Sequence, residues 1–182
     1  YCEKISAEAK ATEAVNCVKV HEGIFTGYNT DVYGFYMLLK KNNLIGNKKQ
    51  VLLIGAGGAA KAVYYVLNEH SVHEVYVANR TREKAQILTK YVVEIADLKI
   101  AARNFDIIIN CTPVKTGLFF TEADLKTDAC LIDLKYHVLN DFKDVRYISG
   151  TDMFIYQAKK SLEIWLEKTC DEKILYKILG KE

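Results

Sequence analysis

Residues 51–63 read VLLIGAGGAAKAV. An apolar run of strand length is followed by a glycine-rich turn and by the first residues of an amphipathic helix. Gly55 allows the backbone to leave the strand sharply, and Gly57 places no side chain where an anion must approach. Ala60 is small enough for close packing, and the N–H groups at the helix start face the anion. The stretch predicts a phosphate-binding turn, although the same glycine spacing also occurs at strand ends that bind nothing.

The composition is that of an ordinary globular protein. The 182 residues suffice for one substantial domain, or for one domain and part of another. The 25 basic and 23 acidic residues form no long block, and the net charge is +2. This balance argues against nucleic acid or an anionic membrane as the main partner. Because no apolar run approaches the roughly 18 to 20 residues that span a bilayer, we expect a soluble protein.

The five cysteines are scattered and include no C-x-x-C pair. An odd number without such pairs favours reduced thiols over a disulfide framework or a zinc site. We therefore expect a cytoplasmic protein with no metal site.

Strands and helices alternate along the middle of the chain. Strands are predicted at residues 51–54, 74–78, 105–110, 129–133 and 147–148. Helices are predicted at residues 59–70 and 82–92, whereas the pattern over 93–104 is ambiguous and 118–128 is loop-like. This alternation indicates parallel βαβ units in an α/β fold, a Rossmann-type doubly wound parallel sheet.

The flanking segments have different patterns. Residues 1–16 look helical with Ser6 as a cap, and residues 15–20 and 24–28 read as the strands of a hairpin. A further helix is expected to begin in Asn29-Thr30-Asp31 and to end near Gly46. Two more helices are predicted over residues 151–168 and 174–179.

Polar residues follow two of the predicted central strands, at the sheet edge where ligands bind. Asn79-Arg80-Thr81 lies 24 residues after Gly55, where an NAD site presents an acidic residue to the ribose. A guanidinium and a hydroxyl stand there instead, followed by Lys84, which suits the 2′-phosphate of NADP. The alternative is that Arg80 is a solvated surface residue. Residues 110–113, Asn-Cys-Thr-Pro, either approach a nicotinamide or form an ordinary turn.

Several blocks together resemble shikimate dehydrogenase. In chain order they are Glu13-Ala14-Val15-Asn16, GYNTDVYG over residues 27–34, GAGGAAKA over 55–62, Asn79-Arg80-Thr81, Asn110-Cys111-Thr112-Pro113 and Tyr156-Gln157-Ala158. The resemblance runs over nearly the whole chain, and the G-Y-N-T-D-x-x-G block is its most specific part. It implies NADPH-dependent, reversible reduction of 3-dehydroshikimate to shikimate in aromatic amino acid (chorismate) biosynthesis.

The resemblance also assigns residues. Asp31 matches the carboxylate that pairs with a catalytic lysine. The substrate-binding residues implied are Asn16, Asp31, Tyr136 and Gln157. The cofactor-binding residues, with Lys84 added from the charge argument, are Gly55, Ala56, Gly57, Gly58, Ala59, Asn79, Arg80, Thr81, Lys84 and Thr112. In the alternative interpretation neither residue has a role in binding. Asp31 is then only a charge at a helix N-terminus, and Gln157 is only an exposed helix residue.

The departures from the family pattern concern catalysis. The family's catalytic lysine and a serine pair belong to an amino-terminal domain that we expect before Tyr1, and neither Lys10 nor Lys19 has the lysine's surroundings. Lys115 stands where the family usually has glycine, next to the nicotinamide pocket. We therefore expect residues 1–28 to be a remnant linking to that domain, 29–150 to be the NADP-binding domain, and 151–182 to be helices packing toward the substrate domain.

Two further expectations and two alternatives follow. The truncated chain should be inactive alone, and the helix over residues 151–168 should leave apolar surface for self-association. One alternative is a quinate/shikimate dehydrogenase that uses NAD. The other is a non-catalytic nucleotide-binding domain.

Overall fold

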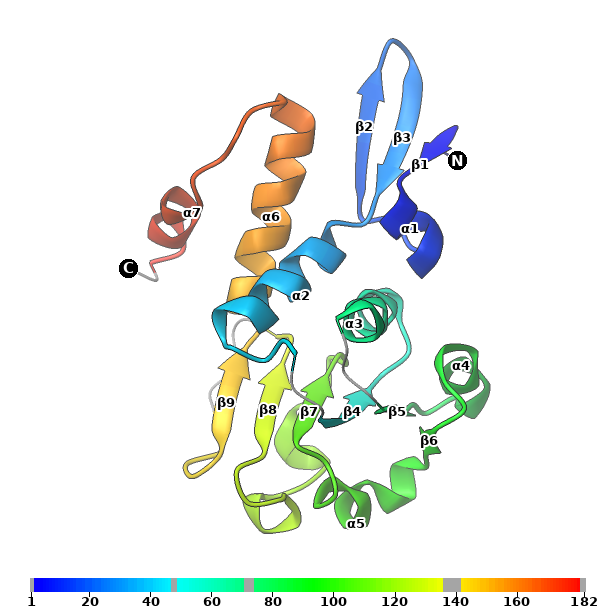
Figure 1. Ribbon diagram of the computed structural model, residues 1–182, viewed down its shortest axis with the longest axis vertical. Helices are drawn as coiled ribbons and strands as arrows, with labels where there is room; N and C mark the ends of the chain where they lie inside the picture. Colours follow the sequence, from blue (N-terminus) through cyan, green and yellow to red (C-terminus); the bar gives the residue numbers. More distant parts are fainter. Residues whose placement is uncertain (1, 47–48, 71–73, 136–141, 181–182) are drawn as a thin grey trace. The chain divides into compact units, whose positions relative to one another are not determined.

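The computed structural model describes residues 2–46, 49–70, 74–135 and 142–180 (Figure 1). The chain divides into two compact units. The first comprises Tyr1–Leu44 and Asp152–Glu182, and the second comprises Ile45–Thr151.

The second unit contains a six-stranded parallel sheet in the order β6-β5-β4-β7-β8-β9. Its strands are β4 (Gln50–Ile54), β5 (Glu74–Ala78), β6 (Val92–Val93), β7 (Ile107–Asn110), β8 (Cys130–Asp133) and β9 (Arg146–Ser149). Its helices are α3 (Gly58–Glu69), α4 (Arg82–Leu88) and α5 (Leu98–Ala102), with short 3₁₀ turns η1 (Ile95–Asp97), η2 (Thr116–Leu118) and η3 (Glu122–Asp124). The doubly wound parallel sheet expected from the sequence is therefore confirmed.

The apolar strands are buried because helices cover both faces of this sheet, α3 on one and α5 on the other (Figure 1). Leu52 and Ile54 of β4 pack in a cluster with Leu98 and Ala102 of α5. On α3, the buried side chains recur at helical spacing: Ala60, Ala62, Val63, Val66 and Leu67. This packing fixes the carboxyl ends of β4, β5 and β7 at one edge.

The differences from the expected elements lie beyond β5. The helix predicted over residues 82–92 ends at Leu88, because Thr89 is extended and Val92–Val93 pairs with β5 as strand β6. The ambiguous residues 93–104 form η1 and α5. Tertiary pairing decides these short segments, whose local patterns are weak.

The first unit has a three-stranded sheet in the order β1-β3-β2. Its elements are β1 (Lys4–Ile5), α1 (Ala7–Thr12), β2 (Cys17–His21), β3 (Ile24–Tyr28), α2 (Thr30–Lys41), α6 (Thr151–Leu166) and α7 (Glu172–Ile178). The hairpin and the Ser6 cap are confirmed; the Ser6 hydroxyl accepts a hydrogen bond from Ala9 N–H at 3.2 Å. The prediction of one helix through residues 1–16 is wrong at its start, because Lys4–Ile5 pairs with β3.

Gly34 allows α2 and α6 to pack closely in the first unit. A Cβ added at Gly34 would lie 2.6 Å from the Met153 carbonyl oxygen and 2.9 Å from Gln157 Cβ. Since only glycine fits this contact, α2 packs with α6. Residues 29–44 therefore lie in the first unit, whereas the sequence analysis groups them with the nucleotide-binding segment.

Candidate functional site

A cleft of about 390 Å³ opens in the second unit at the carboxyl ends of β4, β5 and β7. Its lining comprises Ile54, Gly55, Ala78, Asn79, Arg80, Ile95, Thr112, Pro113, Val114 and Phe119. Gly55 has a φ of +110°, and a Cβ there would lie 3.1 Å from Thr112 Cγ2. Both the backbone conformation and the space therefore require glycine at the turn.

Gly57 caps α3 and faces open space. Apart from its neighbours in the chain, no atom of the described residues would lie within 4 Å of a Cβ at this position. The first hydrogen bond of the helix runs from Lys61 N–H to the Gly57 carbonyl at 3.0 Å, so the N–H groups of residues 58–60 precede the helical ladder. Together with Ala56, Gly58 and Ala59, this turn offers donors and room for an anion.

Arg80 and Lys84 are the cations available at the end of β5. Arg82, between them, forms an ion pair with Glu94, whereas within residues 2–46, 49–70, 74–135 and 142–180 neither Arg80 nor Lys84 has a carboxylate partner. The Asn79 side chain donates to the Thr81 carbonyl at 2.8 Å and shapes the turn. Arg80 and Asn79 line the cleft; Thr81 and Lys84 follow them in the chain, are exposed and are not among the lining residues.

Thr112 forms the opposite wall of the cleft from a firmly held loop. Its N–H and hydroxyl both donate to Asn110 Oδ1, at 2.9 and 2.8 Å. The predicted cofactor-binding set leaves out several lining residues: Ile54, Ala78, Ile95, Pro113, Val114 and Phe119. Ile95 lies in the ambiguous segment, and Phe119 lies in an expected loop, within the apolar run Leu118-Phe119-Phe120.

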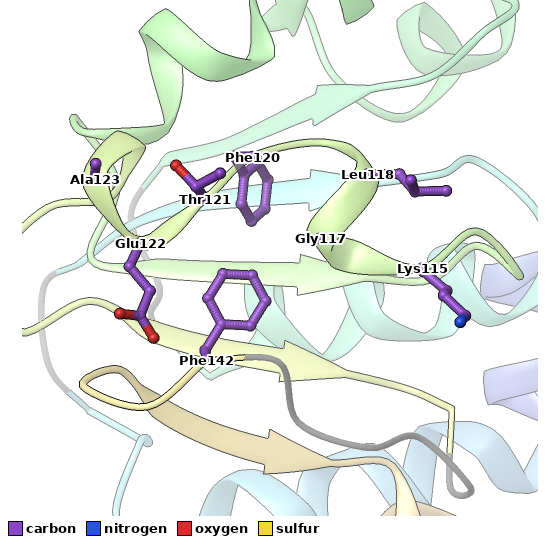
Figure 2. A pocket seen from close by; sticks show the side chains of 8 residues that line it. All are labelled: Lys115, Gly117, Leu118, Phe120, Thr121, Glu122, Ala123 and Phe142. Atoms are coloured by element: carbon purple, nitrogen blue, oxygen red, sulfur yellow. The ribbon is translucent and has the colours of Figure 1, made fainter.

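Lys115 lines a different cavity. This cavity, of about 490 Å³, lies between Phe120 and Phe142, with Lys115 at one end and Glu122 at the other (Figure 2). The backbone of Lys115 is ordinary, with φ −63° and ψ 133°, so the position does not need glycine. Lys115 is not among the residues lining the cleft beside Gly55.

A polar cluster forms in the first unit around Thr30, which is 2% exposed. Asn16 Oδ1 accepts hydrogen bonds from Thr30 N–H at 2.8 Å and from the Thr30 hydroxyl at 3.1 Å. The Thr30 hydroxyl also lies 3.0 Å from Ser161 Oγ and 3.4 Å from Gln157 Oε1. Because Gly34 admits α6, the side chains of Asn16 and Gln157 meet at one hydroxyl.

Asp31 belongs to the same cluster. It lies in the first turn of α2, and Oδ1 of the N-cap residue Asn29 accepts a hydrogen bond from Asp31 N–H at 3.1 Å. Burial raises the pKa of the Asp31 carboxyl, and a hydrogen bond from Asn16 opposes that shift. The structure thus brings together Asn16, Asp31 and Gln157, while Tyr136 lies outside the described residues.

The raised pKa of Asp31 gives a stability prediction. The folded state binds the proton of the Asp31 carboxyl more tightly than the unfolded chain does. The contribution of this carboxyl to the free energy of unfolding is therefore most favourable below the unfolded pKa, near 3.9. That contribution is lost as pH rises through the folded pKa. Asp31→Asn should therefore raise the melting temperature at pH 7, with a gain that shrinks toward pH 4.

Thermal melts of both proteins across this pH range check the prediction. Thr30→Ser, which keeps the hydroxyl at the cluster, is the control and should show no such pH-dependent gain. A lower melting temperature for Asp31→Asn at pH 7 would mean that the carboxylate acts mainly on the helix dipole.

Other kinds of site find no support in the described part of the chain. Among those residues, no group of three or more His, Cys, Asp or Glu side chains could hold a metal ion. No helix there is long and apolar enough to cross a membrane. Cys2, Cys17, Cys111, Cys130 and Cys170 form no disulfide in the described part of the chain.

Comparisons with known proteins identify relatives of this chain and structures with the same fold. A family model described as shikimate/quinate 5-dehydrogenase matches residues 38–135. A shikimate dehydrogenase (NADP(+)) from Methanococcus maripaludis strain C6 is 33% identical over 206 positions, which cover 100% of this chain and 72% of the relative.

Two solved structures show how far the likeness extends. Shikimate 5-dehydrogenase from Thermus thermophilus, in complex with NADP(H) and shikimate, matches with a TM-score of 0.80 and 28% identity, over 94% of this chain and 69% of that one. Shikimate 5-dehydrogenase from Listeria monocytogenes, in complex with shikimate and NAD, matches with a TM-score of 0.79 and 25% identity. The match covers 98% of this chain and 72% of that one.

Proposed function

Because the chain belongs to the shikimate/quinate 5-dehydrogenase family, we propose that it is the NADP-binding portion of an NADP-dependent shikimate dehydrogenase. The reaction is the reversible reduction of 3-dehydroshikimate to shikimate, a cytoplasmic step of aromatic amino acid biosynthesis. The observation that carries the proposal is the cleft lined both by Gly55, the first glycine of the turn, and by Arg80, whose guanidinium has no carboxylate partner in the described part of the chain. A dinucleotide with an additional phosphate is the ligand that this pair of features suits.

The residues of the cleft fit NADP. The helix start after Gly57 suits the pyrophosphate, and Arg80 with Thr81 and Lys84 suits the 2′-phosphate. Thr112 borders the half of the cleft left for the nicotinamide. NADPH, when bound, supplies the hydride for the ring ketone, and the chain's task is to hold it in place and exclude water.

The polar cluster of the first unit fits a polyhydroxylated ring. The amides of Asn16 and Gln157 can each donate to and accept from ring hydroxyls. The pKa of the Asp31 carboxyl is raised, which suits exchange of a proton with the family's catalytic lysine. That lysine would lie beside the oxygen of the ketone, which becomes the hydroxyl. Tyr136 is proposed for the substrate carboxylate by its match to the family alone.

The 182-residue chain should bind NADPH and oxidise little or no shikimate. No lysine of the chain matches the family's catalytic lysine by motif, and loss of a general acid typically lowers rates by ~10²- to 10⁴-fold. Shikimate oxidation is measured by NADPH absorbance at saturating NADP⁺, with the Methanococcus maripaludis relative as the positive control. Turnover comparable to that of the control would refute the proposed inactivity.

Two alternatives remain testable. A quinate/shikimate dehydrogenase that uses NAD would bind NAD⁺ as well as NADP⁺, and a relative crystallised with NAD makes this comparison necessary. A non-catalytic nucleotide-binding domain would bind the cofactor and lack a catalytic partner. The gene sequence upstream of Tyr1 distinguishes this alternative from the enzyme. A lysine-containing domain encoded there in frame would contradict the non-catalytic alternative.

An apolar sheet face is the surface that we propose for the amino-terminal domain, or for self-association in its absence. Cross-strand pairing puts Ile5, Val18, Val20 and Phe25 on one face of β1-β3-β2, each at least 40% exposed. The surface expected on α6 is also exposed at its end, with Trp165 at 52% and Leu166 at 60%, although the Trp165 indole donates to the Val18 carbonyl at 2.9 Å. We therefore propose the sheet face as an association surface in addition to α6.

Light scattering at increasing protein concentration should show a growing mass that Val20→Lys abolishes. Ile24→Lys, on the opposite face of the same hairpin, is the control and should still associate. A monomer at high concentration for the unaltered chain would contradict the proposal.

A further inference from the structure

Asp133 is a fully buried carboxylate at the carboxyl end of β8. Its Oδ2 accepts a hydrogen bond from the Thr116 hydroxyl at 2.6 Å and lies 3.3 Å from Lys135 Nζ. Its Oδ1 accepts from Lys135 N–H at 3.1 Å. Both oxygens are therefore engaged, and the ammonium of Lys135 balances the charge.

Asn110, its neighbour across the strand pairing, extends this network to the loop after β7. The buried Asn110 amide donates to Thr116 Oγ1 at 3.0 Å and to the Val114 carbonyl at 2.9 Å. Thr116 thus accepts from Asn110 and donates to Asp133, which gives a continuous chain of polar bonds. Lys135 Nζ also donates to the Val114 carbonyl.

This hydrogen-bond network ends at a wall of the cleft. Asn110 Oδ1 holds both the N–H and the hydroxyl of Thr112, and Thr112 with Val114 lines the cleft beside Gly55. Thr112, Val114 and Thr116 of this loop are thus hydrogen-bonded to Asn110, and Thr116 connects Asn110 to the buried carboxylate. None of these hydrogen bonds involves Arg80 or the start of α3.

A buried ion pair is a poor source of stability, because desolvation offsets most of the attraction between the charges. An apolar residue at position 133 would suit the surrounding strand better, so the carboxylate needs another reason. We propose that Asp133 is a positioning residue, acting through Thr116 and Asn110 to fix the loop that borders the nicotinamide half of the cofactor. This inference rests on the proposed function.

Comparison of two ligands separates positioning from general stability. NADPH reaches both halves of the cleft, whereas adenosine 2′,5′-bisphosphate occupies only the half near Arg80. Thr116→Val and Asp133→Asn should each weaken NADPH binding about tenfold, as loss of a hydrogen bond to a charged group predicts. Affinity for the bisphosphate should stay within about twofold of that of the unaltered chain.

Two controls complete the titrations. Thr116→Ser keeps the hydroxyl and should restore NADPH affinity. Asp106→Asn removes a carboxylate that accepts from Gln50 N–H at 2.9 Å near the amino end of β7, and it should leave both affinities unchanged. Equal losses for the two ligands, or no loss for either, would overturn the positioning role. Failure of the unaltered chain to bind either ligand would instead overturn the proposed function, and the inference with it.

Discussion

Gly57→Asp is expected to lower the affinity for NADPH by about 100-fold, near 2.7 kcal/mol, while the melting temperature stays equal or rises. Gly57 is the N-cap of α3, and its backbone, with φ −87° and ψ −170°, admits any residue. Aspartate is a favoured N-cap and complements the helix dipole. The same carboxylate would occupy the donors and repel the pyrophosphate.

Isothermal titration and thermal melts of the same samples measure the two effects. Gly57→Asn is the matched control, because it has the same shape and capping ability without the charge, and it should lose less affinity. Gly55→Ala should behave in the opposite way and lose stability, since φ is +110° there. Tight NADPH binding by Gly57→Asp would show that the turn holds no phosphate.

Arg80→Ala is expected to weaken NADPH binding by about 10- to 100-fold and to leave NADH binding nearly unchanged. The guanidinium lines the cleft without a carboxylate partner in the described part of the chain, so it is available to a phosphate. A hydrogen bond between charged groups contributes about 1.5–3 kcal/mol, and Arg80 is exposed enough for salt to screen part of it.

Arg82→Ala is the matched control for this effect. It removes a guanidinium two residues away that is already paired with Glu94, and the affinity for NADPH should change little. The loss caused by Arg80→Ala should also shrink as the salt concentration rises. Equal losses for NADPH and NADH, or equal effects of the two substitutions, would contradict a 2′-phosphate site at Arg80.

The parts of the fold that could be predicted are those with strong local signals. The run from Val51 to Ile54 is apolar on both faces, and the glycines after it mark the turn, so β4 and α3 follow from the sequence alone. The helix after Asn29 is predicted for the same reason, because its cap and its apolar spacing agree.

The parts that could not be predicted depend on contacts between distant segments. A glycine such as Gly34 lowers the stability of a helix, and the sequence offers no reason for it. The reason is the close approach of Met153 and Gln157 in the folded protein. Ile95 and Phe119 reach the cleft through irregular loops. From the sequence, Asp133 is interpreted only as the polar end of a strand. Its partner Thr116 lies 17 residues away, and Asn110 belongs to the neighbouring strand β7.

Titration of the unaltered chain with NADP⁺ and with NAD⁺ tests the central claim most directly. The cleft that joins the glycine turn to Arg80 should bind NADP⁺ with one-to-one stoichiometry and at least about tenfold more tightly than NAD⁺, because only NADP⁺ carries the phosphate that suits Arg80. Equal affinity for the two dinucleotides, or binding of neither, would contradict the account.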